Sequence, residues 1–308
     1  MMNKIVAVQG NHPSKLNPIT DTSVFLANEI QSKKYKIFYY DPKDLSVINS
    51  KVIAKGFFIK FDYTHKKFFK ILKKQKLDLT ECKFILIRQD PPFNLEYISA
   101  TYILDTIKDK VKIINNPTSI RNISEKLYSV KYQKYMPSTI FTQNIDEIKK
   151  FFKIHKKVIL KPIHSFSGND IHLLNKFDLK LIQRFIKQHD HIMCQKYLPK
   201  ISKGDKRVFL INGKVCGAIS RVPKKGSFLS NMSKGAKPIN IKLTKTENKI
   251  SKLIAKDLKK ENIYFSGIDF IDQKLNGDIN VTSPTGLKTL FDLSGINLAK
   301  TFWKDLKA

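Results

Sequence analysis

The amino-acid sequence predicts an N-terminal α/β domain followed by an α+β region. Residues 4–40 run in the order strand, polar loop, helix, strand, which is typical of a parallel α/β unit with a ligand loop after its first strand. The later part of the chain holds β-rich runs separated by turn-forming residues, a pattern typical of hairpins. A chain of 308 residues can bury a large core and is expected to divide into about two or three subdomains.

Residues 1–119 are expected to form the N-terminal domain, because short apolar runs alternate there with segments of helical spacing. Pro91 and Pro92 come shortly after one of these runs, so a stiff turn is expected at the carboxyl end of that strand. The expected strands are residues 4–9, 36–40, 84–88 and 112–114, and the expected helices are residues 22–32 and 99–107.

Residues 120–308 are expected to form two α+β subdomains, about 120–195 and about 196–308. The Asn212-Gly213 pair predicts a two-residue hairpin turn, since both residue types tolerate positive φ. A polar loop at residues 162–169 contains one glycine and is a weak signal for a phosphate-binding flap. The expected helices are residues 123–132, 145–155, 179–189, 243–258 and 296–307, and the expected strands are residues 138–142, 158–161, 170–174, 191–197, 207–211 and 215–221.

A hairpin within residues 264–287 carries the candidate metal ligands. Asp278 and Asn280 lie two apart on one expected strand and therefore share a face. With a two-residue turn, Asp269 on the other strand would lie about 13 Å from Asn280, whereas a four-residue loop at residues 273–276 would place them opposite each other. We expect the second register, which gathers two carboxylates and an amide oxygen, ligands suited to a Mg²⁺ ion that also holds phosphate oxygens. The alternative is a hairpin with an ordinary solvated polar face.

The formal charge of +31 would suit a nucleic-acid or anionic-membrane partner. The lysines, however, are spread along the whole chain, so a lysine-rich solvated surface explains the charge and we expect neither partner. The three cysteines are not paired in sequence, which excludes a disulfide scaffold and favours the cytoplasm. No apolar run is long enough to cross a bilayer, and the first ten residues read as a strand rather than a signal peptide.

Several segments together resemble one family, the bacterial glutathione synthetases of the ATP-grasp superfamily. Their order and spacing hold over nearly the whole chain, and DPPF with INVTSPT is more specific than any single motif. The matching segments are IRQDPPF at 87–93, ATYIL at 100–104, the NP, R and EKL positions within 116–127, ILKP at 159–162, the Q and YLP positions within 195–199, GDKRV at 204–208 and DINVTSPT at 278–285.

The resemblance implies an ATP-grasp fold preceded by a parallel α/β domain, the pre-ATP-grasp domain. It implies that γ-glutamylcysteine and glycine are joined with ATP through an acyl phosphate, and that the protein is a homotetramer. Phosphoryl transfer depends on charge neutralisation and in-line positioning. The implied cofactors are therefore ATP and Mg²⁺, with Mn²⁺ as an alternative metal.

The resemblance also implies roles for individual residues. Lys126 and Lys161 would hold the ATP phosphates, and Arg207 and Arg221 would act catalytically on carboxylate or acyl-phosphate oxygens, as bidentate donors do well. Without the family resemblance, the sequence alone would indicate ordinary surface lysines and arginines on a strand surface. The further implied nucleotide ligands are Ser165, Ser167, Gly168, Gln195, Tyr197, Leu198, Asp205 and Asn231; the metal ligands are Asp269, Asp278 and Asn280; the substrate residues are Arg88, Asp90, Ser283, Thr285 and Gly286.

Two loops depart from the family pattern. The flap, usually KP followed by DGxGG, has His164 in place of an acid and keeps only Gly168, which limits close backbone approach to phosphate. The second loop, usually RGNLAAGG, begins with Leu229 instead of arginine, and Asp278 stands where the family has a metal glutamate. Three interpretations stay open: a working synthetase with altered loops, a paralogous ATP-grasp ligase with a different acid or amine acceptor, and a non-catalytic ATP-binding relative.

Overall fold

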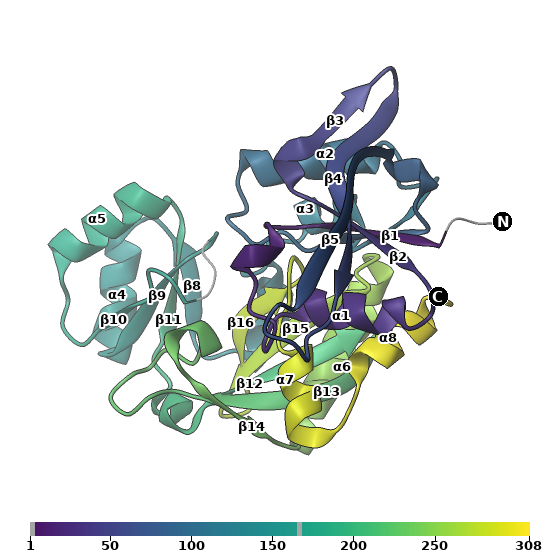
Figure 1. Cartoon of the computed structure of the whole chain (residues 1–308). Coiled ribbons are helices and arrows are strands. Elements are labelled where there is room, and N and C mark those ends of the chain that lie inside the picture. The colour runs from purple at the N-terminus through teal and green to yellow at the C-terminus, as the bar shows by residue number, and fades with distance from the viewer. Residues whose placement is uncertain (1–3, 165–167) are drawn as a thin grey trace.

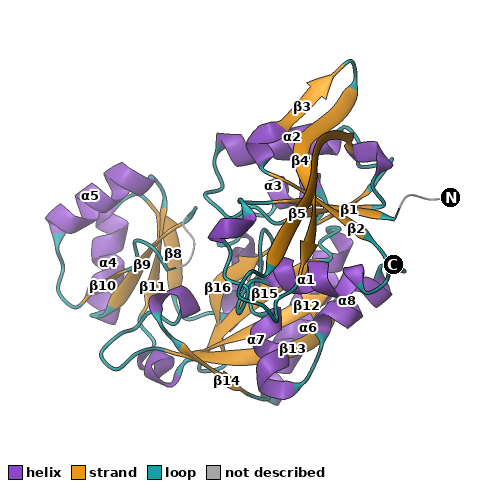
Figure 2. Ribbon diagram, in the orientation of Figure 1, coloured by secondary structure: helices purple, strands orange, loops and turns teal. Residues whose placement is uncertain are grey.

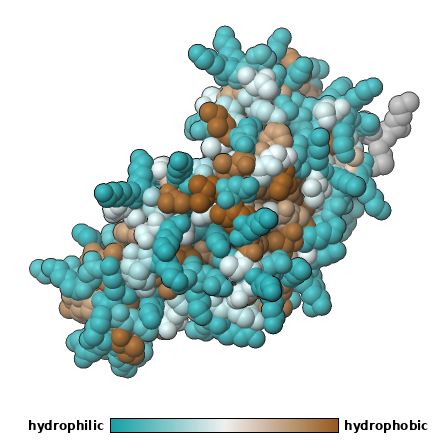
Figure 3. Space-filling view, turned by 90° about the horizontal axis from the view of Figure 1, so that it is seen from below, coloured by the Kyte–Doolittle hydropathy of each residue, from teal (hydrophilic) through white to brown (hydrophobic). Residues whose placement is uncertain are grey.

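The computed structural model describes residues 4–164 and 168–308, and within them the chain forms three β-sheets with helices packed against them (Figure 1). Figure 2 shows one of these sheets standing apart with its two helices, while the other two lie one above the other. No helix in the described part is long and apolar enough to cross a membrane. Figure 3 shows hydrophilic side chains over most of one face, with apolar groups gathered near its middle.

The N-terminal sheet has the predicted parallel centre, in which β1 (Ile5–Gln9) pairs with β2 (Lys36–Tyr40) and β6 (Phe84–Ile87). Successive residues of β1 face opposite sides of the sheet. Val8 therefore packs with helix α1 (Thr22–Gln31), whereas Ala7 packs in the core on the opposite side of the sheet. The remaining elements of this layer are β7 (Lys112–Ile114), α2 (Leu95–Asp105) and α3 (Pro117–Asn122).

An antiparallel extension of this sheet was not predicted. It consists of β3 (Leu45–Ile48), β4 (Lys51–Phe61) and β5 (Phe69–Asp78), which lie beyond β2. Among the described strands β5 pairs only with β4, and its free edge carries exposed lysines. Lysines on an edge strand prevent pairing with other chains. The same lysines interrupt the apolar alternation by which the strand is recognised in the sequence.

The next sheet has its own core and the strand order β10–β9–β11–β8. The helices predicted at residues 145–155 and 179–189 are confirmed, and each begins at an asparagine or aspartate cap. The elements are β8 (Thr139–Thr142), α4 (Ile145–His155), β9 (Val158–Pro162), β10 (His172–Leu174), α5 (Leu179–His189) and β11 (Ile192–Lys196).

The third sheet has the order β14–β13–β12–β15–β16. The predicted Asn212-Gly213 turn is confirmed, with positive φ at both residues. The helix predicted at residues 123–132 is wrong: α3 ends at Asn122 and a 3₁₀ segment, η4, follows at Leu127–Tyr135, because Glu125 binds a distant backbone instead of continuing a helix. The elements are β12 (Asp205–Ile211), β13 (Lys214–Val222), β14 (Lys237–Asn240), α6 (Lys245–Lys260), β15 (Phe265–Ile271), β16 (Lys274–Asn280), α7 (Leu287–Ser294) and α8 (Leu298–Asp305).

The predicted hairpin at residues 264–287 is present, but its predicted register is wrong. Asp272 and Gln273 form a two-residue turn with positive φ, not a four-residue loop. Asn280 therefore pairs with Gly267 instead of Asp269. The pairing shifts between Ile268 and Phe270, so that Asp269 faces residues 276–278. The residues that were expected to lie in the loop therefore lie in a bulge of β16.

The N-terminal sheet and the end of the chain share one hydrophobic core. Trp303 of α8 is fully buried there, and its indole N–H donates to the carbonyl oxygen of Leu26 at 2.8 Å. Asn115, just after β7, bonds the backbone of β15 and of Val281. These contacts fix the carboxyl edge of the first sheet beside the turn that follows β16.

Candidate active site

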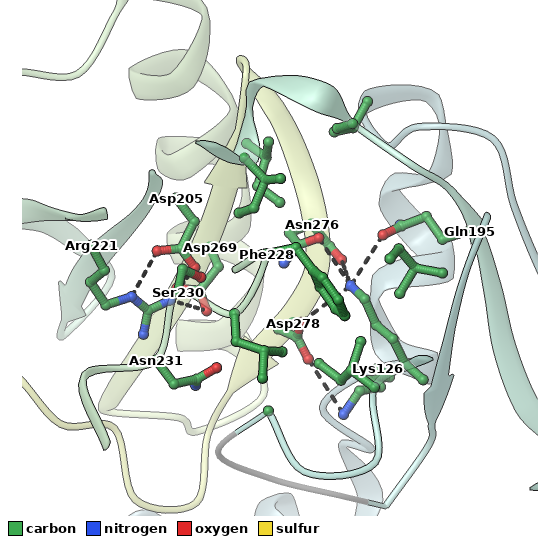
Figure 4. Close-up of a pocket in the computed structure, with 18 of the residues that line it drawn as sticks. Lys126, Gln195, Asp205, Arg221, Phe228, Ser230, Asn231, Asp269, Asn276 and Asp278 are labelled. Carbon is green, nitrogen blue, oxygen red and sulfur yellow. Dashed lines mark hydrogen bonds and ion pairs between the residues drawn. The ribbon is translucent and has the colours of Figure 1, made fainter. Parts of the chain in front are cut away.

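One cavity gathers the predicted nucleotide, catalytic and metal residues (Figure 4). Its volume is about 130 Å³, and it lies between β9 and β11 on one side and β12, β13, β15 and β16 on the other. Ser165 and Ser167 lie outside the described residues. The predicted residues that line the cavity are Lys126, Lys161, Gly168, Gln195, Tyr197, Leu198, Asp205, Arg207, Arg221, Asn231, Asp269, Asp278 and Asn280. The structure brings these side chains together, and their roles stay predictions.

Two lysines meet Asp278 inside the cavity. Lys126 Nζ lies 3.4 Å from Asp278 Oδ1, and Lys161 Nζ lies 3.7 Å from Oδ2. Lys161 also donates to Gln195 Oε1 at 3.1 Å and to the carbonyl and side-chain oxygens of Asn276 at 3.0 Å each. Burial lowers the pKa of Lys161, against the opposing effect of Asp278. Two cations beside one partly exposed carboxylate make a place that can accept phosphate oxygens.

Two arginines hold a second pair of carboxylates. Arg207 donates to both oxygens of Asp269 at 2.5 and 2.8 Å, and Arg221 donates to Asp269 Oδ2 at 2.9 Å and to Asp205. Burial alone would raise the pKa of Asp269, but the two guanidinium groups lower it to about 2. Burial raises the pKa of Asp205 despite Arg221. Both oxygens of Asp205 are engaged by Arg221, so its predicted contact with ribose requires an exchange of partners.

The candidate metal ligands combine carboxylates with one amide. Asn280 Oδ1 is buried and has no hydrogen-bond partner among the described residues, so it can accept a metal ion. Asp278 is 28% exposed and Asp269 is held by its arginines. Residues 4–164 and 168–308 contain no group of three or more His, Cys, Asp or Glu side chains placed to hold a metal by themselves. Asp278 and Asn280 therefore fit an Mg²⁺ ion whose coordination is completed by phosphate oxygens and water, whereas Asp269 would have to exchange its arginine partners to join them.

The two loops that depart from the family pattern touch each other at the cavity. Gly168 has φ +71°, and a Cβ added there would lie 2.4 Å from Asn231 Oδ1. Figure 4 places Phe228 and Asn231 on the same loop, which borders the cavity between the arginine and lysine groups. Burial and the neighbouring Lys126 lower the pKa of His164. Gly168 thus lies close to Asn231 of the second loop at the cavity.

Some lining residues were not predicted from the sequence. Ile159 lies two residues before Lys161 on β9 and shares its face. The alternation of side chains along a strand could therefore have identified it from the sequence. Ile201 and Ile271 add to this apolar wall, which suits a flat aromatic base. Asn276 carries no such signal, because its contact with Lys161 depends on the bulge in β16.

The predicted substrate residues form a separate group at the carboxyl end of β6. Arg88 donates to Ser23 Oγ at 3.0 Å and to the carbonyl oxygen of Pro284 at 3.1 Å, while its Nη1 is buried and without a partner in the described chain. Burial lowers the pKa of Arg88 and raises that of Asp90, which accepts from Asn11.

The turn after β16 lies against this group. Ser283 Oγ donates to the carbonyl oxygen of Gln89 at 2.7 Å. Gly286 has φ +114° and its N–H donates to Thr22 Oγ1 at 3.1 Å, whereas Thr285 is exposed. The two groups of predicted residues are therefore joined by one short segment, residues 280–286.

Known proteins match the chain over nearly its whole length. The model of the prokaryotic glutathione synthetase N-terminal domain matches residues 5–121, and that of the prokaryotic glutathione synthetase ATP-grasp domain matches residues 125–295. A glutathione synthetase from Agrobacterium fabrum is 33% identical over 97% of this chain and 95% of its own length. The one from Brucella melitensis is 34% identical over 98% of each chain. The Escherichia coli enzyme is 33% identical over 90% of this chain and 89% of its own length.

Solved ATP-grasp structures share the fold. The ligase PsnB in complex with a phosphomimetic precursor variant, Mg and ADP superposes with a TM-score of 0.65 at 12% identity, covering 99% of this chain and 98% of that one. D-alanyl-alanine synthetase A from Vibrio cholerae gives a TM-score of 0.61 at 14% identity, covering 98% and 99%. The predicted fold class, an ATP-grasp domain after an α/β domain, is confirmed.

Proposed function

Because the chain belongs to the prokaryotic glutathione synthetase family, we propose that it joins γ-glutamylcysteine to glycine while ATP is split into ADP and phosphate. It is an ATP-dependent ligase that forms a peptide bond. The observation that carries the proposal is the convergence in one cavity of a lysine group around Asp278 and an arginine group around Asp269.

The nucleotide is proposed to lie between the two sheets that border the cavity. The adenine occupies the apolar wall near Tyr197 and Leu198, and the phosphates lie at Lys126 and Lys161. Asp278 and Asn280 would hold Mg²⁺, or Mn²⁺, together with Asp269; the remaining proposed nucleotide contacts are Ser165, Ser167, Gly168, Gln195, Asp205 and Asn231. When bound, the ion neutralises charge on the phosphate oxygens.

The residues of the chain act by positioning and by charge. A substrate carboxylate oxygen attacks the γ-phosphorus, ADP leaves, and an acyl phosphate forms. The glycine amine then attacks the acyl carbon, and phosphate leaves with the electron pair of the C–O bond. Arg207 and Arg221 stabilise the oxygens on which negative charge gathers, and the buried cavity makes each of these contacts stronger than in water.

The acid substrate is proposed to reach the cavity from the N-terminal domain. Arg88 has a buried Nη1 without a partner in the described chain, so a substrate carboxylate can supply the missing acceptor. Asp90, Ser283, Thr285 and Gly286 are proposed to contact the same substrate. Beyond the site, a homotetramer, a cytoplasmic setting and the lack of nucleic-acid or membrane partners belong to the proposal as expectations.

The test is ADP release with Mg²⁺, ATP and γ-glutamylcysteine, with glycine or with a panel of other amines. The proposal requires release that depends on both substrates, with glycine preferred, and that is lost in Lys161→Ala. Lys150→Ala is the matched control, because Lys150 lies exposed on α4 of the same subdomain and pairs only with its helix neighbour Glu147 in the described contacts. Release with another amine would establish a different acceptor, and nucleotide binding without release would exclude a ligase.

A further inference from the structure

Glu125 holds the backbone on both sides of Asn280. Its carbonyl oxygen accepts from the N–H of Ile279 at 2.9 Å, and its carboxylate Oε1 accepts from the N–H of Val281 at 3.1 Å. The same oxygen accepts from the N–H and the hydroxyl of Thr282, at 3.3 and 2.8 Å. One residue thus fixes the peptide groups before and after a proposed metal ligand.

This arrangement matters because Asn280 Oδ1 has no hydrogen-bond partner within residues 4–164 and 168–308. The direction of that oxygen is therefore set through the backbone. The carbonyl of Val281 accepts from Asn115 Nδ2 at 2.7 Å, so the Val281 residue is held at its N–H by Glu125 and at its C=O by Asn115. Gly267 pairs with Asn280 from the neighbouring strand.

The next residue along the chain, Lys126, contacts Asp278, another of the three proposed metal ligands. Lys126 Nζ lies 3.4 Å from Asp278 Oδ1. Residues 125 and 126 therefore contact residues 278, 279, 281 and 282, although Glu125 and Val281 are 156 positions apart in the sequence.

We propose that Glu125 is a positioning residue that directs the Asn280 side chain toward the metal carried by the bound nucleotide. The inference rests on the proposed function. The acceptor oxygen of Glu125 has this role, rather than its charge, because three donors converge on the single atom Oε1. An amide oxygen can accept the same donors, whereas a shortened or missing side chain leaves them unsatisfied.

The experiment measures ATP affinity by calorimetry, once with Mg²⁺ and once with EDTA, in the absence of the acid and amine substrates. The dissociation constant with EDTA divided by the one with Mg²⁺ reports how well the protein holds the metal on the nucleotide. Glu125→Ala removes the acceptor and Glu125→Asp withdraws it while keeping the charge; each is expected to reduce the ratio about tenfold. Glu125→Gln keeps the acceptor and is expected to stay within about threefold of the original chain.

Glu247→Ala is the matched control. Glu247 is also a buried glutamate, and its Oε2 accepts from the N–H of Thr244 and from Lys206, each at 2.8 Å, at the start of α6. Its loss is expected to lower the melting temperature and to leave the ratio unchanged. If Glu125→Asp keeps the ratio while Glu125→Gln loses it, charge acts and the inference is overturned; an unchanged ratio in all three variants overturns it as well. If Mg²⁺ has no effect on ATP binding by the original chain, the proposed function fails and the positioning role fails with it.

Discussion

Lys161 and Asp278 form an ion pair of 3.7 Å across the cavity, although β9 and β16 belong to different sheets. The Lys161 ammonium also donates to two oxygens of Asn276, so it joins the two subdomains at one point. A phosphate group that enters the cavity competes for the same ammonium. Where the phosphates bind Lys161 as proposed, nucleotide binding and the relative placement of the two sheets are expected to be coupled.

Replacing Lys161 by methionine should separate activity from stability. The side chain is 5% exposed, and burying an ammonium there has a desolvation cost that an apolar chain of similar length avoids. Because Gln195 and Asn276 lose their donor, we expect the free energy of unfolding to fall by about 1–3 kcal/mol, while kcat/KM for ATP falls about a hundredfold or more. Urea unfolding and steady-state kinetics on the same preparation measure both; a variant that keeps its activity would refute the phosphate role.

Acid should weaken the fold through Asp269. Its pKa is lowered from 3.8 to about 2 by Arg207 and Arg221, so its stabilisation is complete above about pH 4 and is lost as the pH falls through 2. The shift corresponds to about 2 kcal/mol. Asp269→Asn should lose this stability at neutral pH and show a flatter acid dependence in urea titrations. Parallel curves for the two chains would show that the arginine pair does not stabilise the carboxylate.

Asn280→Ala should affect metal use more than folding. Because Asn280 Oδ1 has no partner in the described chain, its removal is expected to change the free energy of unfolding by less than about 1 kcal/mol. The Mg²⁺ concentration for half-maximal activity should rise about tenfold. Asn280→Asp, which keeps an oxygen in place, should restore part of the metal response. An unchanged Mg²⁺ titration in the alanine variant would remove Asn280 from the ligand set.

Gly168→Ala tests the contact between the two altered loops. Both Gly168 and Gly226 have positive φ, but a Cβ at Gly168 meets Asn231 Oδ1 at 2.4 Å, whereas nothing lies within 4 Å of a Cβ at Gly226. We expect kcat to fall about tenfold or more in Gly168→Ala and to stay near its original value in Gly226→Ala. Adding Asn231→Ala should recover part of the loss. Equal effects of the two glycine changes would point to backbone strain alone.

The sequence predicted well the elements whose pattern is local. Residues 36–40, 145–155 and 179–189 form the expected strand and helices, since apolar spacing and the Asn144 and Asp178 caps specify them. The β4–β5 extension was not predicted because four consecutive polar residues at 73–76 of β5 interrupt the alternation. The hairpin register was wrong for a different reason: the turn lies at Asp272-Gln273, and a bulge in β16 takes up the residues that the expected four-residue loop at 273–276 would have used.

The candidate site shows the same difference between features with a local sequence signal and features that depend on the folded backbone. The residue types and motif positions predicted which side chains line the cavity, including Lys126, Lys161 and Asp278. Contacts that depend on the folded backbone had no local signal. Glu125 and Asn276 belong to this class, since each binds a partner far away in the sequence.

Isotope transfer tests most directly whether a substrate carboxylate takes the phosphoryl group before the amine attacks. γ-Glutamylcysteine carrying ¹⁸O in both oxygens of its cysteinyl carboxylate would be incubated with the protein, ATP, Mg²⁺ and glycine, and the phosphate and the peptide analysed by mass spectrometry. We expect one ¹⁸O in the released phosphate and the other in the carbonyl of the new amide. Unlabelled phosphate, or ADP release without peptide, would contradict it.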